Sequence, residues 1–208
     1  MARYTVPLLL LSLSILLLSG GANSCRRCSR ARSFIINTCR ATQYPKSCER
    51  ALSGYLNSTY PSHQQLAQVA LRVSLTRAKF ARAYLVKLAS KYKGSHGPEY
   101  QALGECLDQI NDSVVQLRQS LMELQTYSQE GVLDSFMWHM SNAKTWASTA
   151  LTDQMDCVEA ISTSRHGKQV KTGIKGRVTE VAQATSNALA LLNRFIMQRR
   201  FVRGNHRP

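Results

Sequence analysis

The sequence lacks the short motifs that mark the active sites of many enzymes. It contains no H-E-x-x-H, no G-x-S-x-G and no glycine-rich phosphate loop. Its five histidines are scattered, and none belongs to a Glu-x-x-His pair of the kind that binds metals inside helical bundles. These absences argue against an enzyme. We therefore expect no catalytic residues, no cofactor and no metal site.

Aromatic residues and prolines are also scarce, at 7% and five residues respectively. Nucleic-acid binding would need base-stacking aromatics among the basic residues, so we do not expect a nucleic-acid partner. Alanine, leucine, glutamine and serine are common instead, which is the composition of packed helices.

Long apolar runs are missing after the first residues of the chain. The run Val6–Leu18 covers only 13 residues, whereas a membrane-spanning helix needs about 20. It follows Arg3 and precedes Ala22-Asn23-Ser24, which fits a small-x-small cleavage site. We predict a signal peptide over residues 1–24 and a secreted protein without a membrane anchor. A membrane anchor is the alternative interpretation.

Acidic residues are few, and most of them lie in one part of the chain. The sequence has 27 Lys and Arg against 12 Asp and Glu, a formal net charge of +15. Ten of the twelve acids lie from Glu99 to Glu159, where only Arg118 and Lys144 oppose them, so this segment carries a net charge of −8. The remainder is basic, which suggests two surfaces with different roles.

Six cysteines in a secreted chain indicate disulfides. Cys39 and Cys48 enclose a short loop, and Cys106 and Cys157 are the remaining well-separated pair. Cys25 and Cys28 form an isolated C-x-x-C in a basic N-terminal segment, residues 25–32. No second C-x-x-C accompanies it, so we expect a local disulfide or a loose tail there, and neither zinc nor redox chemistry.

Hydrophobic periodicity predicts four long helices, at about residues 62–93, 99–126, 134–152 and 178–200, with a loop at about 162–176. Two short helical segments around Tyr44-Pro45 precede them. We predict an all-α fold: an antiparallel four-helix bundle (61–200) after an N-terminal helical hairpin (33–60), stabilised by disulfides and followed by a basic tail (201–208).

The second predicted helix has the most regular pattern. Its apolar residues alternate in steps of four and three, a spacing typical of knobs-into-holes packing: Leu103, Leu107, Ile110, Val114, Leu117, Leu121 and Leu124. Cys106 then falls at a position that flanks this seam and faces a neighbouring helix. A disulfide from there to Cys157 would contribute on the order of 3 to 4 kcal/mol through loop entropy.

Two sequons match the N-glycosylation pattern. Asn57 lies in a predicted loop, and Asn111 lies within the second predicted helix, which is a less usual place. We predict both as glycosylation sites.

Several stretches match a known family in order and spacing: FIINTCRATQYPKSCERAL, CLDQINDSVVQL, WASTALTDQMDC and TSNALALL. Through them the chain resembles the plant invertase and pectin methylesterase inhibitors from about Ser33 to Met197. The resemblance implies a helical hairpin on a four-helix bundle, with disulfides Cys39–Cys48 and Cys106–Cys157. It also implies a secreted inhibitor of the apoplast and cell wall that covers the substrate cleft of a carbohydrate enzyme.

The resemblance favours the pectin methylesterase branch, because the Pro-Lys-Phe that often precedes the fourth cysteine in the invertase branch is absent here. In the esterase branch the second and third bundle helices contact the enzyme. This implies partner contacts by Asp108, Asp112, Thr149, Thr152 and Asp153. The family's usual tyrosine and a frequent later aspartate are replaced by Ile110 and Val115, so individual contacts differ from the family pattern.

Three other interpretations remain open at this point. The target enzyme could be acid invertase. From another class, the chain could be a basic defence protein acting on microbial membranes. Finally, the basic residues, among them Lys168, Lys171, Lys175, Arg177 and the tail from Arg199 to Arg207, could bind de-esterified pectin, a polyanion.

Overall fold

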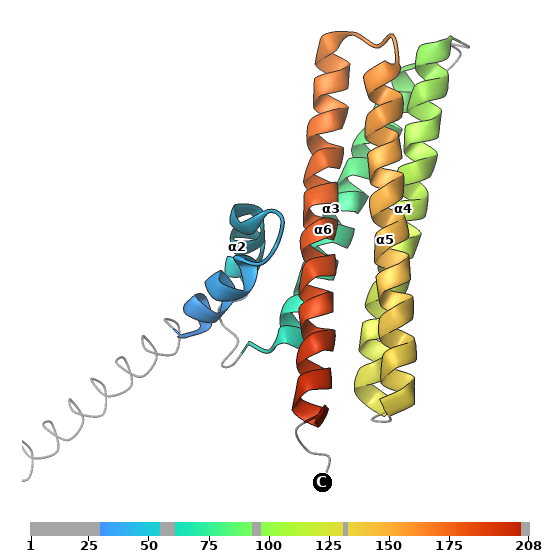
Figure 1. The fold of residues 1–208 in the computed structure, drawn as a ribbon. Helices are drawn as coiled ribbons and strands as arrows, with labels where there is room; N and C mark the ends of the chain where they lie inside the picture. Colours follow the sequence, from blue (N-terminus) through green and yellow to red (C-terminus); the bar gives the residue numbers. More distant parts are fainter. Residues whose placement is uncertain (1–29, 55–60, 93–96, 131–132, 205–208) are drawn as a thin grey trace, which may run out of the picture.

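The computed structural model describes residues 30–54, 61–92, 97–130 and 133–204. Within these ranges every regular element is helical, and four long helices run side by side (Figure 1). The predicted all-α bundle is therefore confirmed. The leader (1–24), Cys25, Cys28 and Asn57 lie outside the described residues, and their predictions stay as they are.

The bundle consists of α3 (His63–Ala89), α4 (Pro98–Glu130), α5 (Leu133–Thr163) and α6 (Lys168–Gly204), with a short 3-10 turn, η1 (Ser90–Tyr92), after α3. Successive helices are antiparallel (Figure 1). The most extensive contacts join α4 to α5 and α3 to α6, so the bundle is built from two helix pairs. None of the described helices combines the length and the apolar character needed to cross a membrane.

A capping box starts α3. The Ser62 side chain accepts a hydrogen bond from the backbone N–H of Gln65, and the Gln65 side chain accepts one from the backbone N–H of Ser62. Two backbone donors at the helix start are thereby satisfied.

The regular seam of α4 forms part of the core. Leu103, Ile110, Leu117 and Leu124 are completely buried, and Leu107 and Leu121 pack against the core while partly buried. The helices that face this seam present small residues: Ala143, Ala147 and Ala150 of α5 are also completely buried. Large side chains of one helix thus pack against small side chains of the next, which lets the helices approach closely.

The predicted boundaries of the last two helices are wrong. We expected the third bundle helix to end at about 152 and a loop to follow from about 162 to 176. The structure instead continues α5 to Thr163 and starts α6 at Lys168, and α6 then runs to Gly204, into the predicted tail. Cys157 consequently lies within α5, and the connection between the helices is only residues 164–167.

Gly173 explains part of this discrepancy. Glycines, serines and lysines suggested a loop, but a Cβ at residue 173 would lie 2.7 Å from the Tyr84 hydroxyl of α3. Glycine at this point lets the Tyr84 side chain lie close against α6, and it does not mark a turn. The Arg177 guanidinium stacks on the same tyrosine ring, 3.9 Å from its centroid.

The N-terminal hairpin packs on the bundle beside α3 and α6 (Figure 1). It consists of helical residues 30–39 and of α2 (Pro45–Ser53), which begins with a proline in its first turn. A disulfide joins Cys39 to Cys48 across the bend. At the bend, Tyr44 exchanges two hydrogen bonds with the side chain of Asn187 in α6, which fixes the hairpin on the bundle.

A second disulfide joins Cys106 of α4 to Cys157 of α5, and both cysteines are completely buried. These are the two pairs that the family resemblance implies. The second bond closes a separation of 51 residues and locks together the two helices that carry most of the acidic residues.

Candidate partner-binding surface

The acidic segment of the sequence forms one helix pair in space. Most of its described acidic side chains are exposed or half-buried on α4 and α5: Glu99, Glu105, Asp108, Asp112, Glu123, Asp153, Asp156 and Glu159. The charge segregation seen along the chain is therefore also a segregation between the α4–α5 pair and the α3–α6 pair.

On α4, acidic and apolar side chains share one exposed stripe. Asp108, Val115 and Met122 follow one another at intervals of seven residues, two helical turns, so they lie in line. Val115 and Met122 are 53% and 51% exposed, unlike the seam residues of the same helix. Asp112, one turn after Asp108, is also exposed.

On α5, Asp153 lies beside α4, whereas Thr149 and Thr152 fall progressively further round the outer side of the helix. Thr149 and Thr152 are exposed, and their hydroxyls donate to backbone carbonyls one turn earlier, at Thr145 and Ser148. Their methyl groups and remaining oxygen lone pairs stay available to a partner. Trp146 stands two turns before Asp153 on the same stripe and is 39% exposed.

Asp153 is an acidic residue of this surface whose pKa is shifted by its surroundings. Its burial raises the pKa of the carboxyl above the usual value, the Asp112 charge on α4 raises the pKa further, and Asp156 adds to it. A hydrogen bond from Gln116 opposes the rise in the pKa. The Oδ2 atom of Asp153 is buried and has no hydrogen-bond partner within the described part of the chain.

We call this surface the α4–α5 face. Its members are Asp108 and Asp112 of α4 and Trp146, Thr149, Thr152 and Asp153 of α5. Val115 and Met122 lie on the part of α4 that is turned away from α5, so they are outside this face. The five predicted contact residues are exposed or half-buried on the two helices, and Asp112 and Asp153 approach each other across them. Their role in binding stays a prediction.

The sequence analysis missed the exposed apolar residues of this helix pair. Val115 was noted only as a departure from the family pattern, while Met122 and Trp146 were not considered. A signal existed, because Val115 and Met122 fall outside the four-three seam of α4 and hence could not belong to the core. Surface aromatic residues with apolar neighbours are typical of binding sites.

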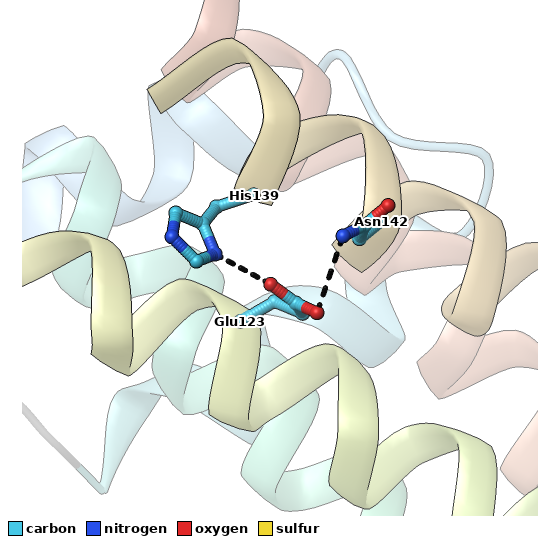
Figure 2. A network of polar contacts seen from close by, with 3 residues as sticks. All are labelled: Glu123, His139 and Asn142. Atoms are coloured by element: carbon cyan, nitrogen blue, oxygen red, sulfur yellow. Dashed lines mark hydrogen bonds and ion pairs between the residues drawn. The ribbon is translucent and has the colours of Figure 1, made fainter. Parts of the chain in front are cut away.

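A polar cluster fixes the two helices at one end of the face. Figure 2 shows the Glu123 carboxylate of α4 between His139 and Asn142 of α5: Glu123 Oε2 lies 2.6 Å from His139 Nδ1, and Oε1 accepts a hydrogen bond of 3.3 Å from Asn142. The His139 side chain is only 9% exposed. Further along the same helix pair, the buried Gln154 side chain donates to Ser113 Oγ at 2.7 Å.

The other predicted sites are less informative. Asn111 is half-buried in the middle of α4, next to Asp112, so its glycosylation stays a prediction. Within residues 30–54, 61–92, 97–130 and 133–204, no three metal-ligating side chains come together.

Comparisons with known proteins give a consistent result. The family model described as plant invertase/pectin methylesterase inhibitor matches residues 33–191. Pectinesterase inhibitor 9 of Arabidopsis thaliana is 39% identical over 192 residues, which cover 92% of this chain and 94% of the relative. Pectinesterase inhibitor 11 of the same plant is 37% identical, over 92% and 95% of the two chains.

A solved structure also has this fold. The crystal structure of a mutant form of a pectin methylesterase inhibitor from Arabidopsis has a TM-score of 0.59 and 17% sequence identity, covering 74% of this chain and 92% of that chain. At this identity the likeness concerns the fold alone.

Proposed function

The chain belongs to the plant invertase/pectin methylesterase inhibitor family, and from this membership we propose that it is a secreted inhibitor that blocks the substrate cleft of pectin methylesterase. The observation that carries the proposal is the 39% identity to a pectinesterase inhibitor over 94% of its length. Since the family consists of inhibitors, the chain is not an enzyme.

Rigidity supports this function. The α4–α5 face is built on two helices that a disulfide, the Glu123 cluster and the Ser113–Gln154 hydrogen bond hold together. A surface that is already ordered loses little conformational entropy on binding, so more of the contact energy remains as affinity. Such a face can act as a rigid plug.

The negative charge of the face is complementary to a partner surface that carries positive charge. An enzyme that produces carboxylates along a polysaccharide needs a cleft compatible with negative charge, and Lys or Arg at its rim would attract Asp108 and Asp112. Complementary charges of this kind speed association, and salt weakens the attraction. The unpartnered Asp153 Oδ2 offers a further acceptor for a donor on the enzyme.

Trp146 supplies an apolar contact on the face. It is 39% exposed on α5 and can be buried when the enzyme covers the face. Tryptophan is enriched among the few residues that dominate binding energy at protein interfaces. We propose Trp146 as the principal contact residue, on the stripe of α5 that also carries Asp153.

Acid invertase is less favoured as the target, because two relatives that match over 92% of this chain are named pectinesterase inhibitors. A membrane-active defence protein is also less favoured. Such a protein needs an exposed amphipathic helix, whereas the apolar stripes of these helices are buried against one another.

The decisive test is a titration of the secreted chain against purified pectin methylesterase and, in parallel, acid invertase, at the mildly acidic pH of the apoplast. We expect inhibition of the esterase alone. The variant with Asp108→Lys and Asp112→Lys should inhibit about tenfold or more weakly, a change of at least about 1.4 kcal/mol. A matched reversal of exposed charges on α3, Lys79→Glu with Lys87→Glu, is the control. Full inhibition by the first variant would contradict the role of this face.

A further inference from the structure

A shallow groove runs along the first half of α6, away from the α4–α5 face. It has a volume of about 870 Å³, and the end of α5, the connecting residues and the outer side of α6 line it. Its basic side chains are Lys168, Lys171 and Lys175. Gly176 lies at the groove without a side chain, and a Cβ there would meet open space.

The three lysines form a row on one side of α6. They stand at positions i, i+3 and i+7, which spreads them over about 10 Å along the helix. Lys171 and Lys175 are half-buried, and Lys171 Nζ donates to the Ser162 carbonyl at 3.0 Å, so this ammonium group is already held at the groove. The row begins at the N-terminal end of α6, where the helix dipole adds positive potential.

His166 supplies an independent observation at the same place. It lines the groove, is only 6% exposed, and stacks edge-on with Tyr92 at 5.6 Å between ring centroids. Its Nε2 atom has no hydrogen-bond partner among the described residues. Buried polar side-chain atoms normally have one. Because Nε2 is itself buried, an acceptor oxygen in the groove would reach it only after the ring turns outward, with the proton on Nε2.

We propose that this groove binds a uronate polymer through its carboxylates, with Lys168, Lys171 and Lys175 pairing with successive negative groups. His166 turns outward on binding and donates one hydrogen bond from Nε2. A row of fixed cations fits a chain with repeated charges better than it fits a single small anion. Glu180 lines the far end of the groove and limits the cationic part to the first two turns of α6.

The choice of uronate among polymeric anions rests on the proposed function, because the product of a pectin methylesterase is a chain of free uronate carboxylates. The existence of an anion site does not depend on that function. None of the groove residues belongs to the α4–α5 face, so the molecule can bind polymer and enzyme at the same time.

The test measures binding of a fluorescent oligogalacturonate to the full secreted chain at low salt. The triple variant Lys168→Gln, Lys171→Gln, Lys175→Gln should raise the dissociation constant about tenfold or more. The control triple Lys79→Gln, Arg82→Gln, Lys87→Gln removes the same charge from exposed positions of α3. It should change the dissociation constant less than about threefold. Equal losses in the two triples would overturn the proposal.

His166→Phe tests the ring nitrogen, because it keeps an aromatic ring against Tyr92. We expect about threefold to tenfold weaker binding with an unchanged unfolding midpoint. Unchanged affinity would overturn the proposed site. Two results would overturn the choice of uronate. In the first, sulfated dextran competes as strongly per charge as polygalacturonate does. In the second, fully methylesterified pectin binds equally well.

Esterase inhibition by the same variants separates this proposal from the preceding one. The Lys168 triple should inhibit as the unchanged protein does while failing to bind polymer. Conversely, a chain that binds polymer through this groove but inhibits no esterase would contradict the proposed function and leave the site standing.

Discussion

Among the single residues of the α4–α5 face, Asp153 has an unusual electrostatic environment. Its position between Asp112 and Asp156, partly removed from water, makes its charged form unfavourable. The sequence predicted an acidic residue on this face. It could not predict the raised pKa, which depends on the approach of a second helix.

The raised pKa gives a pH-dependent effect on stability. As the pH rises above the ordinary aspartate pKa of about 3.9, the unfolded chain loses its proton first, so the free energy of unfolding falls until the folded carboxyl has ionised too. Asp153→Asn removes this fall in the free energy of unfolding, because asparagine does not ionise. We expect the variant to melt at the same temperature as the native chain at about pH 3 and a few degrees higher at pH 7.

Thermal unfolding followed by circular dichroism between these pH values measures this difference. Asp108→Asn, on the same face, controls for the removal of one exposed charge. A difference between the Asp153 variant and the native chain that is the same at every pH would contradict the assignment.

Trp146 gives a prediction about binding. If it is the principal contact residue, Trp146→Ala should weaken esterase inhibition about 10- to 100-fold, with little change in the unfolding midpoint. Phe80→Ala is the matched control, since Phe80 is an exposed aromatic (72%) on α3, outside the face. Inhibition constants from steady-state kinetics measure both. Equal effects of the two substitutions would exclude a special role for Trp146.

At the scale of the helices, the seam of α4 was predictable and the ends of α5 and α6 were not. Seven apolar residues in regular steps can only be buried on one side of a helix, whatever its neighbours are. Gly173 and Gly176, by contrast, look like loop residues in the sequence. Only the packing of Tyr84 against α6 shows why a glycine lies inside the helix at residue 173.

These two glycines differ in a testable way. Gly176→Ala adds a methyl group in open space and should raise the free energy of unfolding by about 0.5 to 1 kcal/mol through helix propensity. Gly173→Ala has the same gain in helix propensity but forces the Tyr84 hydroxyl to move. Its gain in the free energy of unfolding should therefore be smaller than that of Gly176→Ala, or become a loss. Urea unfolding compares them. A larger gain at residue 173 would contradict the packing described here.

The Glu123 cluster gives a second prediction at this scale. Glu123→Ala removes the carboxylate that His139 and Asn142 both contact. Because these polar side chains then lose that contact away from water, the free energy of unfolding should fall by about 1 to 3 kcal/mol. Glu105→Ala breaks only an exposed hydrogen bond from Gln101 and should change the free energy of unfolding by less than about 0.5 kcal/mol. Similar costs in urea unfolding would show that the cluster adds no stability.

For the whole molecule, hydrophobic periodicity predicted the helical bundle and the charge pattern predicted a distinct acidic surface. The acidic segment predicted a separate surface, and α4 and α5 do pair. The position of the hairpin beside α3 and α6 could not be predicted, because it depends on contacts such as Tyr44 with Asn187, 143 residues apart.

The two disulfides should differ in their effect on global stability. Replacing Cys106 and Cys157 together by alanine opens a separation of 51 residues and should lower the free energy of unfolding by about 4 kcal/mol. The same change at Cys39 and Cys48, separated by nine residues, should cost about 2 to 3 kcal/mol. Guanidinium unfolding of the two variants measures the costs, and the reverse order would contradict the loop-entropy account.

The pairing of α4 with α5 and of α3 with α6 has one further consequence. With acidic residues concentrated in the first pair and basic residues in the second, the molecule carries an electric dipole across the bundle. A polyanionic gel such as a cell wall rich in uronate would rotate such a molecule before contact, with the basic pair turned towards the gel. The acidic pair would then point outward, into the water-filled space through which a diffusing enzyme arrives.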